Sequence, residues 1–262
     1  MTKQTIAYSL FDPTGNITLL AETPVPAPVQ PQIAQKLMAA EPGAEQVGFV
    51  TPGGDGAIRL RMAGGEFCGN ASLCAAALYL RRTGRSEGNV TVRVEGTAEP
   101  VSVAVSALSG DAWKGAVAMP RPLSVGTEEF PGGSRLPVVR FAGIAHVLLE
   151  DAMSPEAAEA LAPDWCRSLG AEALGLLFLS REQNTLRPLV FVSAAGTLCW
   201  ETSCASGTAA VGAWLAAEAG RPVSLSLAQP GGTLEIAADP SGALRLTGTA
   251  RFMRRGAVGV EL

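Results

Sequence analysis

Charged residues are scarce in this chain, and long apolar runs are absent. Asp, Glu, Lys and Arg make up only 17% of the 262 residues, the formal net charge is −4, and no run of Lys or Arg occurs. Nucleic-acid and membrane-surface binders usually carry a basic patch, so neither class of partner is expected. No apolar run reaches transmembrane length and no signal-like stretch begins the chain. We therefore expect a cytoplasmic protein with a small-molecule partner, and leave homodimer formation open.

Cysteines at metal-binding spacing are also missing. The five cysteines form no Cys-x-x-Cys pair, and their odd number does not suit a complete disulfide framework. We therefore expect reduced thiols and no metal site. Any cysteine with a special role should owe that role to its reactivity.

The length and the apolar content indicate two packed domains. Hydrophobic residues make up 47% of the chain, and 262 residues suit two domains of about 130 residues each. A Pro- and Gly-rich stretch between Met119 and Gly133 is the natural boundary. We therefore predict domains at 1–124 and 125–249, with 250–262 returning to the first domain as a strand.

The second half of the chain repeats the first. Gly43–Val50 returns as Gly170–Leu177 with four identities. A helical pattern precedes each copy, at Gln30–Ala40 and again at Ser154–Leu161. Each half therefore predicts the same order of strands and helices, and the chain reads as a duplicated α+β fold.

The repeat also matches two cysteines. Cys68 lies 16 residues before Gly84, and Cys204 lies 16 residues before Gly220. Both intervals are rich in Ala and predict one helix that ends at the glycine. Such a helix has little polar face, so we expect each one at the centre of a curled, mostly antiparallel sheet, with the cysteine at its N-terminus.

Two thiols at helix N-termini suggest a specific chemistry. A helix N-terminus attracts a carboxylate and lowers the pKa of a nearby thiol. The residues that follow the cysteines are small or carry an amide or hydroxyl group: Gly69, Asn70, Ala205 and Ser206. Inverting a carbon centre requires one base on each face of Cα. We therefore predict an amino-acid racemase or epimerase with Cys68 and Cys204 as acid and base, in a cleft between the domains.

The cysteine segments resemble those of diaminopimelate epimerase. Cys68–Cys74 is similar to that family's Cys-Gly-Asn-Gly-x-Arg-Cys signature, and Glu201–Thr208 is similar to its second cysteine motif. The resemblance implies two pseudo-symmetric domains and catalysis without pyridoxal phosphate or another cofactor. It also places Asn16 and Gln46 among the substrate-contacting residues, and suggests that Glu201 holds the substrate ammonium or tunes the thiol.

Departures from that pattern bear on the substrate. The family's Asn position is held by Ile144, and Ser193–Trp200 contains no Arg, so the residues that bind a second amino-acid group are missing. Ile144 and Trp200 suggest a flatter, more apolar pocket, and the Gly-Gly-Glu-Phe-Cys segment that ends at Cys68 resembles histidine racemases of the same superfamily. We favour a substrate with one centre, such as histidine.

Other functions stay open at this stage. The alternatives are a diaminopimelate epimerase, a phenazine-pathway-like isomerase and a non-catalytic amino-acid-binding protein. The phenazine-pathway isomerases resemble this chain but carry Glu where Gln46 stands, and they lack the cysteine pair.

Several further residues have less specific expectations. His146, the only histidine, is expected to pack behind the site rather than to react, and Glu66 is either a ligand or a solvated loop carboxylate. Arg59 and Arg61 share one face of a strand, which lines the cleft or meets solvent. The remaining cysteines are expected in the core: Cys74, Cys166 and Cys199.

Overall fold

The computed structural model describes residues 3–95, 97, 99–131, 133–150, 153–194 and 196–261. The chain forms two compact units, unit 1 with Met1–Ala118 and Thr247–Leu262, and unit 2 with Met119–Leu246. The first segment of unit 1 therefore ends at Ala118, a few residues before the predicted boundary at residue 124. The cause is local: Arg121 donates to the carbonyl of Ser241 at 3.3 Å and Pro122 lies beside Gly242, so this segment packs on unit 2.

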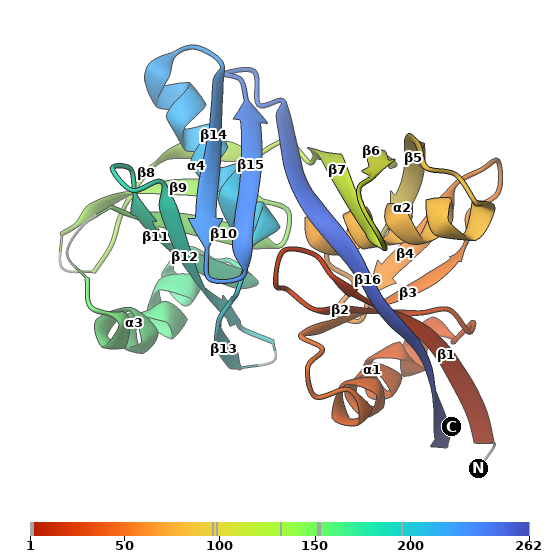
Figure 1. Ribbon diagram of the computed structural model, residues 1–262. Coiled ribbons are helices and arrows are strands. Elements are labelled where there is room, and N and C mark those ends of the chain that lie inside the picture. Colours follow the sequence, from red (N-terminus) through yellow and green to blue (C-terminus); the bar gives the residue numbers. More distant parts are fainter. Residues whose placement is uncertain are drawn as a thin grey trace. The chain divides into compact units, whose positions relative to one another are not determined.

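The described part of unit 1 forms strands, α-helices and a short 3-10 helix (Figure 1). Its strands are β1 (Lys3–Asp12), β2 (Thr18–Ala21), β3 (Gln46–Pro52), β4 (Ile58–Met62), β5 (Glu87–Val94), β6 (Val101–Ala107), β7 (Ala112–Met119) and most of β16 (Leu244–Glu261). Its helices are η1 (Ala27–Val29), α1 (Gln30–Ala40) and α2 (Gly69–Thr83). The strands follow one another in chain order, and β16 neighbours both β7 and β1, so the sheet closes on itself. The pairs β1–β2, β3–β4, β5–β6, β6–β7 and β1–β16 are antiparallel, and the pairs β2–β3 and β4–β5 are parallel.

Helix α2 is buried against the strands of unit 1 because its side chains are small and apolar. It packs on β2, β4, β5 and β6, and most of its residues are buried. Gly115 on β7 is required by this packing, because a Cβ there would lie 2.1 Å from a methyl carbon of Leu73. The helix ends at Gly84, which has φ 68° and so takes the left-handed conformation that glycine tolerates.

Unit 2 repeats this plan. Its strands are β8 (Ser124–Glu129), β9 (Arg135–Phe141), β10 (Ile144–Leu149), β11 (Ala173–Ser180), β12 (Thr185–Val192), β13 (Thr197–Trp200), β14 (Val223–Gln229) and β15 (Gly232–Ala238), and its helices are α3 (Pro155–Ser168) and α4 (Ala205–Ala219). Helix α4 packs on β8, β9, β10, β14 and β15 and ends at Gly220 with φ 62°. The parallel pairs β10–β11 and β12–β14 match those of unit 1. The prediction of an α+β chain is therefore confirmed.

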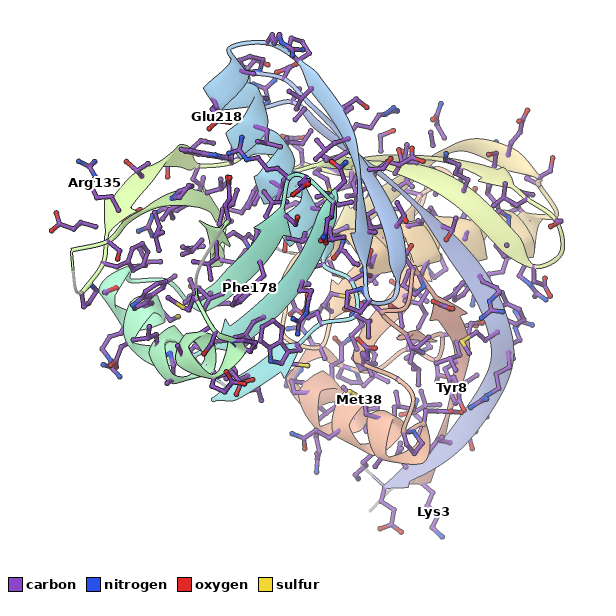
Figure 2. The ribbon with its side chains drawn as sticks, turned by 60° about the vertical axis from the view of Figure 1, so that its left-hand side comes forward. Lys3, Tyr8, Met38, Arg135, Phe178 and Glu218 are labelled. Carbon is purple, nitrogen blue, oxygen red and sulfur yellow. The ribbon has the colours of Figure 1, made fainter. Side chains whose placement is uncertain are left out.

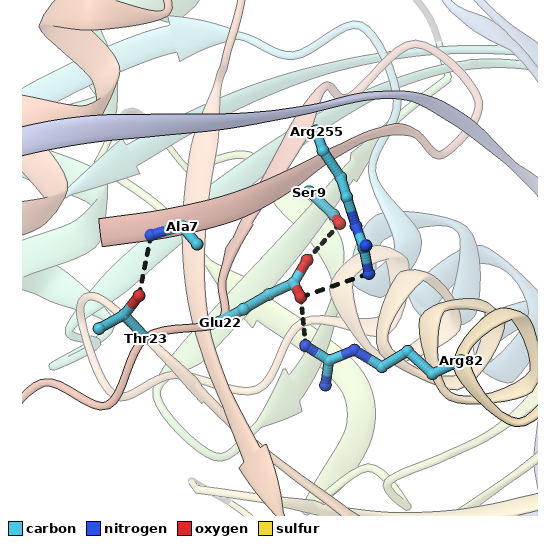
Figure 3. Close-up of polar contacts among 6 residues, drawn as sticks. All are labelled: Ala7, Ser9, Glu22, Thr23, Arg82 and Arg255. Carbon is cyan, nitrogen blue, oxygen red and sulfur yellow. Dashed lines mark hydrogen bonds and ion pairs between the residues drawn. The ribbon is translucent and has the colours of Figure 1, made fainter. Parts of the chain in front are cut away.

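Polar networks join the elements of unit 1. Glu22, after β2, accepts hydrogen bonds from Ser9 on β1 and from Arg82 at the end of α2, and lies 3.8 Å from Arg255 on β16 (Figure 3). Beside it, Thr23 accepts the backbone N–H of Ala7 at 2.8 Å (Figure 3). Because the Glu22 side chain is only 12% exposed, these partners stabilise a charge that is largely removed from water.

A second network lies on the outer side of β1. Tyr8, labelled in Figure 2, donates to the buried carboxylate of Glu41, which also pairs with Arg254 on β16. Burial and the Glu41 carboxylate raise the pKa of Tyr8, so its hydroxyl stays protonated and keeps donating. Among the described residues, no helix combines the length and the hydropathy needed to cross a membrane.

Candidate functional site

The two cysteines cap equivalent helices in the two units. Cys68 immediately precedes α2 and Cys204 immediately precedes α4, and both take the extended backbone conformation of an N-cap. The sulfur of Cys68 accepts the N–H of Ala71 at 3.4 Å, and that of Cys204 accepts the N–H of Gly207 at 3.3 Å. The prediction that each cysteine stands at a helix N-terminus is confirmed.

Hydroxyl groups hold the first turn of each helix in the same way. Ser72 donates to the carbonyl oxygen of Cys68 at 2.7 Å, and Thr208 donates to that of Cys204 at 2.7 Å. The first-turn N–H groups of an α-helix have no partner within the helix, so each thiol lies beside donors that favour an anion. The residues predicted to approach a ligand lie in these two turns, with Gly69, Asn70 and Ala205 buried and Ser206 partly exposed.

A chain of amides orients the thiol of unit 1. Cys68 donates to Oε1 of Gln46 at 3.3 Å. The Nε2 group of Gln46 donates to Thr18 at 2.7 Å and to the side-chain oxygen of Asn16. Asn16 in turn donates to the Glu45 carboxylate at 3.0 Å. Because both amide protons of Gln46 are used, its oxygen is left to face the sulfur.

The structure thus joins Asn16 and Gln46 to Cys68, and it adds Thr18 and Glu45, which the sequence did not single out. Thr18 could have been identified only from the pairing of the strands, because Thr18 lies opposite Gln46 in the register of β2 and β3. Asn16 follows Gly15, whose φ of 91° fixes the turn before β2.

The thiol of unit 2 has different neighbours. The sulfur of Cys204 lies 3.5 Å from the hydroxyl of Ser206, and that hydroxyl lies 3.0 Å from Nε2 of His146 on β10. The backbone N–H of Cys204 donates to Gln229 at 2.8 Å, and Gln229 donates to Thr208 at 2.8 Å. Gln229 ends β14, where no local sequence pattern indicates contact with Cys204.

The pKa of Cys204 shifts in the direction opposite to our expectation. Burial raises its pKa well above the ordinary value, the Glu201 carboxylate raises it further, and the hydrogen bonds from Ser206 and Gly207 lower it less. The expectation that the helix N-terminus lowers the thiol pKa is therefore wrong for Cys204, because only 5% of the residue is exposed and a buried thiolate is poorly solvated. Cys204 is a thiol at neutral pH.

His146 is fully buried, and burial lowers its pKa to about 3. Its imidazole is therefore neutral at pH 7. Its Nδ1 atom has no hydrogen-bond partner among the described residues. Space for the ring comes from Gly175 on β11, where a Cβ would lie 2.2 Å from Nδ1. The histidine thus packs behind Ser206, as expected of a supporting residue.

The remaining cysteines and Glu66 differ in their exposure to solvent. Cys74 and Cys166 are buried, as expected, but Cys199 is exposed because it lies on the short edge strand β13. Glu66 is exposed, with its carboxylate folded back beside Gly64.

Trp200 makes several contacts within unit 2. Its indole N–H donates to Glu159 on α3 at 2.7 Å, and its ring packs on Phe178 and under the guanidinium of Arg187.

Comparison with curated proteins identifies similar sequences of known activity. The chain is 29% identical over 224 residues to a histidine racemase of Fusobacterium nucleatum subsp. nucleatum, with 81% of each sequence covered. It is likewise 29% identical over 227 residues to a histidine racemase of Staphylococcus aureus, with 81% of this chain and 80% of the relative covered.

Solved structures share the fold at lower identity. A predicted epimerase from Pseudomonas aeruginosa matches with a TM-score of 0.75, 19% identity and coverage of 97% of this chain and 99% of that one. A hydroxyproline epimerase from Agrobacterium vitis matches with a TM-score of 0.70, 13% identity and coverage of 98% and 93%. A putative phenazine biosynthesis PhzC/PhzF protein from Clostridium difficile matches with a TM-score of 0.61, 14% identity and coverage of 97% and 100%. The fold alone therefore does not separate racemases from phenazine-pathway proteins.

The family model described as the histidine racemase CntK N-terminal domain matches residues 5–249 of this chain. This match distinguishes the racemases from the phenazine-pathway proteins, which the fold does not. This match covers most of the chain, and it confirms the prediction of an isomerase of the racemase and epimerase class. The chain belongs to the histidine racemase CntK N-terminal domain family.

Proposed function

We propose that this protein is a cofactor-independent histidine racemase in which one of Cys68 and Cys204 removes the Cα proton and the other delivers a proton to the opposite face, within a diaminopimelate epimerase-like pair of pseudo-symmetric domains. The observation that carries the proposal is the matched pair of thiol caps. Two cysteines in equivalent positions each accept the N–H of the third residue that follows. A duplicated fold thereby supplies two acid/base groups of the same kind.

The proton balance of the reaction is simple. A thiolate on one cysteine takes the Cα proton and becomes a thiol, while the thiol of the other cysteine gives its proton to the opposite face and becomes a thiolate. Because burial raises the pKa of Cys204, we propose that the resting enzyme holds Cys204 as a thiol. In the first turnover Cys204 then donates its proton to Cα, and Cys68 is the base that removes the Cα proton. The mechanism requires both thiols to reach the same Cα.

The Cα proton is weakly acidic, so the enzyme must stabilise negative charge that develops on the substrate carboxylate. We assign this task to the first turns of α2 and α4, where the backbone N–H groups and the positive end of the helix dipole favour an anion. Glu201 then receives the substrate ammonium group. The proposed substrate-binding residues are Asn16, Gln46, Gly69, Asn70, Glu201, Ala205 and Ser206.

Histidine is proposed as the substrate because the relatives of known activity are named as histidine racemases. Ile144 is consistent with this choice, because an aliphatic side chain cannot bind a second amino-acid group. Asn16 and Gln46 orient Cys68 while it carries the proton in this account, since Gln46 accepts from the Cys68 thiol and is itself held by Asn16.

The proposal is tested by following the optical rotation of L-histidine with the wild type, Cys68→Ser and Cys204→Ser. Each variant should lose at least about 1,000-fold in kcat, because the alcohol is a far weaker acid and base at neutral pH. Cys199→Ser is the matched control, since this exposed cysteine lies outside the proposed site, and it should keep wild-type activity. Racemisation that survives in either Cys68→Ser or Cys204→Ser would refute the two-thiol mechanism, and turnover of diaminopimelate in place of histidine would refute the substrate.

A further inference from the structure

Unit 1 contains a pocket that the proposed reaction does not use. Its volume is ≈ 390 Å³, which is within the range of small-molecule sites. It lies between the segment before α1 and the strands β3, β4 and β5. Six of its lining residues matter here: Gln30, Phe49, Thr51, Arg59, Arg61 and Arg93. We refer to it as the arginine pocket.

The arginine pocket and Cys68 are on opposite faces of the sheet. In β4, Ile58, Leu60 and Met62 are buried on the side of α2, so Arg59 and Arg61 point to the other side. The same alternation in β5 puts Arg93 on the outer face, between the buried Val92 and Val94.

Strand β3 follows the same alternation. Gly48 faces Leu60 and Met62, on the side of α2. Gln46 lies two residues earlier, shares that face and contacts Cys68. Phe49 and Thr51 therefore face the arginine pocket.

The charges that line the pocket are not balanced. Arg59 and Arg93 are direct neighbours in the register of β4 and β5, and neither has an ion pair in the described part of the chain. Arg61 is engaged, with Nε 2.6 Å from the Glu95 carboxylate and Nη1 donating to Gln30 at 2.8 Å. Three guanidinium groups thus face one carboxylate, which leaves an excess of two positive charges.

The like charges of Arg59 and Arg93 on paired strands repel each other, and an anion between them would relieve this repulsion. A guanidinium group presents a planar set of donors that matches a phosphate or carboxylate. The excess charge fits a ligand with two negative charges. The apolar side chains of Val25 and Phe49 also line the pocket and favour a ligand with an apolar body.

Unit 2 shows that the fold does not need these arginines. Its equivalent pocket, ≈ 270 Å³, lies between the end of β11 and the start of β12, near Phe178 (Figure 2). There the charged lining residues are one arginine, Arg187, and one carboxylate, Glu150. The same architecture is therefore built with balanced charge, and the excess is particular to unit 1.

We propose that the arginine pocket binds a small organic dianion with an apolar body, either a phosphate monoester or a dicarboxylate. Arg59 and Arg93 contact the anionic group, and Arg61 is held in place by Glu95 and Gln30. This site is separate from the cysteines and does not depend on the histidine racemase proposal.

The test is calorimetric titration of the full chain with phenyl phosphate, phthalate, inorganic phosphate and phenol. Phenyl phosphate or phthalate should bind with a Kd below about 1 mM, and inorganic phosphate and phenol more weakly, since each supplies only part of the ligand. The tighter of the two organic dianions identifies the anionic group.

Variants locate the binding. Arg59→Gln with Arg93→Gln should weaken binding at least about tenfold, and Arg93→Gln alone should weaken it by a smaller factor. Arg187→Gln, the matched change in unit 2, and Cys68→Ser should leave binding unchanged. Any of three results would overturn the proposal. The wild type and the double variant could bind with equal affinity, Arg187→Gln could lose as much affinity as the double variant, or no organic dianion could bind at concentrations up to about 10 mM.

Discussion

Mild acid should destabilise unit 2 through His146. Burial lowers the pKa of this histidine to about 3, whereas in the unfolded chain it is about 6.5. The unfolded chain therefore binds the proton first, so stability is complete above pH 6.5 and falls as the pH drops toward 3. Between pH 7 and pH 5 the free energy of unfolding should fall by about 2 kcal/mol.

The structure explains why the charged ring is not accommodated. Nδ1 of His146 has no partner among the described residues, and its other nitrogen contacts the hydroxyl of Ser206. Gly175 lies against the ring, where even an added Cβ would collide with Nδ1.

The assay is urea denaturation of the wild type and of His146→Gln at pH 7 and pH 5, because glutamine can still bond to Ser206 but does not titrate. His146 is the only histidine, and the carboxylates titrate alike in both proteins, so the difference between the two pH dependences isolates its contribution. The wild type should lose about 2 kcal/mol more than the variant. An equal loss in both proteins would refute the assignment of a neutral, buried His146.

Three further outcomes are expected. Gly175→Ala should destabilise the protein by about 1–3 kcal/mol in urea denaturation, because its methyl group would collide with the imidazole of His146, whereas Gly43→Ala, with open space around it, should be nearly neutral. The thiolate absorbance of Cys204, measured as the wild type minus Cys204→Ala, should appear only above the ordinary cysteine pKa of about 8.5. The free energy of unfolding should fall over the same pH range, because the folded state retains the proton that the unfolded chain loses. A thiolate signal at pH 7 would contradict this. Glu22→Gln should lower the free energy of unfolding by about 1–2 kcal/mol, because both arginine partners lose their counter-ion, and unchanged stability would show that solvent replaces it.

Local patterns were sufficient to predict the elements that carry the cysteines. The Ala-rich intervals after Cys68 and Cys204 predicted two central helices, and the glycines at their ends predicted where they stop. The helix at Gln30–Ala40 was also predicted at its observed bounds. These features depend on residues within a few turns of one another, so the sequence contains them directly.

The features that were missed depend on contacts between distant segments. Gln229 reaches Cys204 because β14 pairs with β12, and no spacing in the sequence indicates this. The high pKa of Cys204 follows from burial, which outweighs the helix dipole and cannot be read from a cap motif. Cys199, which was expected in the core, is exposed because β13 is an edge strand.

The central claim is that one of the two thiols removes the Cα proton of the amino acid and the other protonates the opposite face. Its most direct test is to incubate L-histidine with the enzyme in D2O and to follow the Cα–H signal by NMR, using the wild type, Cys68→Ser and Cys204→Ser. The account predicts that the wild type replaces the Cα proton with deuterium as D-histidine forms, and that both variants lose racemisation. Formation of D-histidine without deuterium at Cα, or undiminished racemisation in either variant, would contradict it.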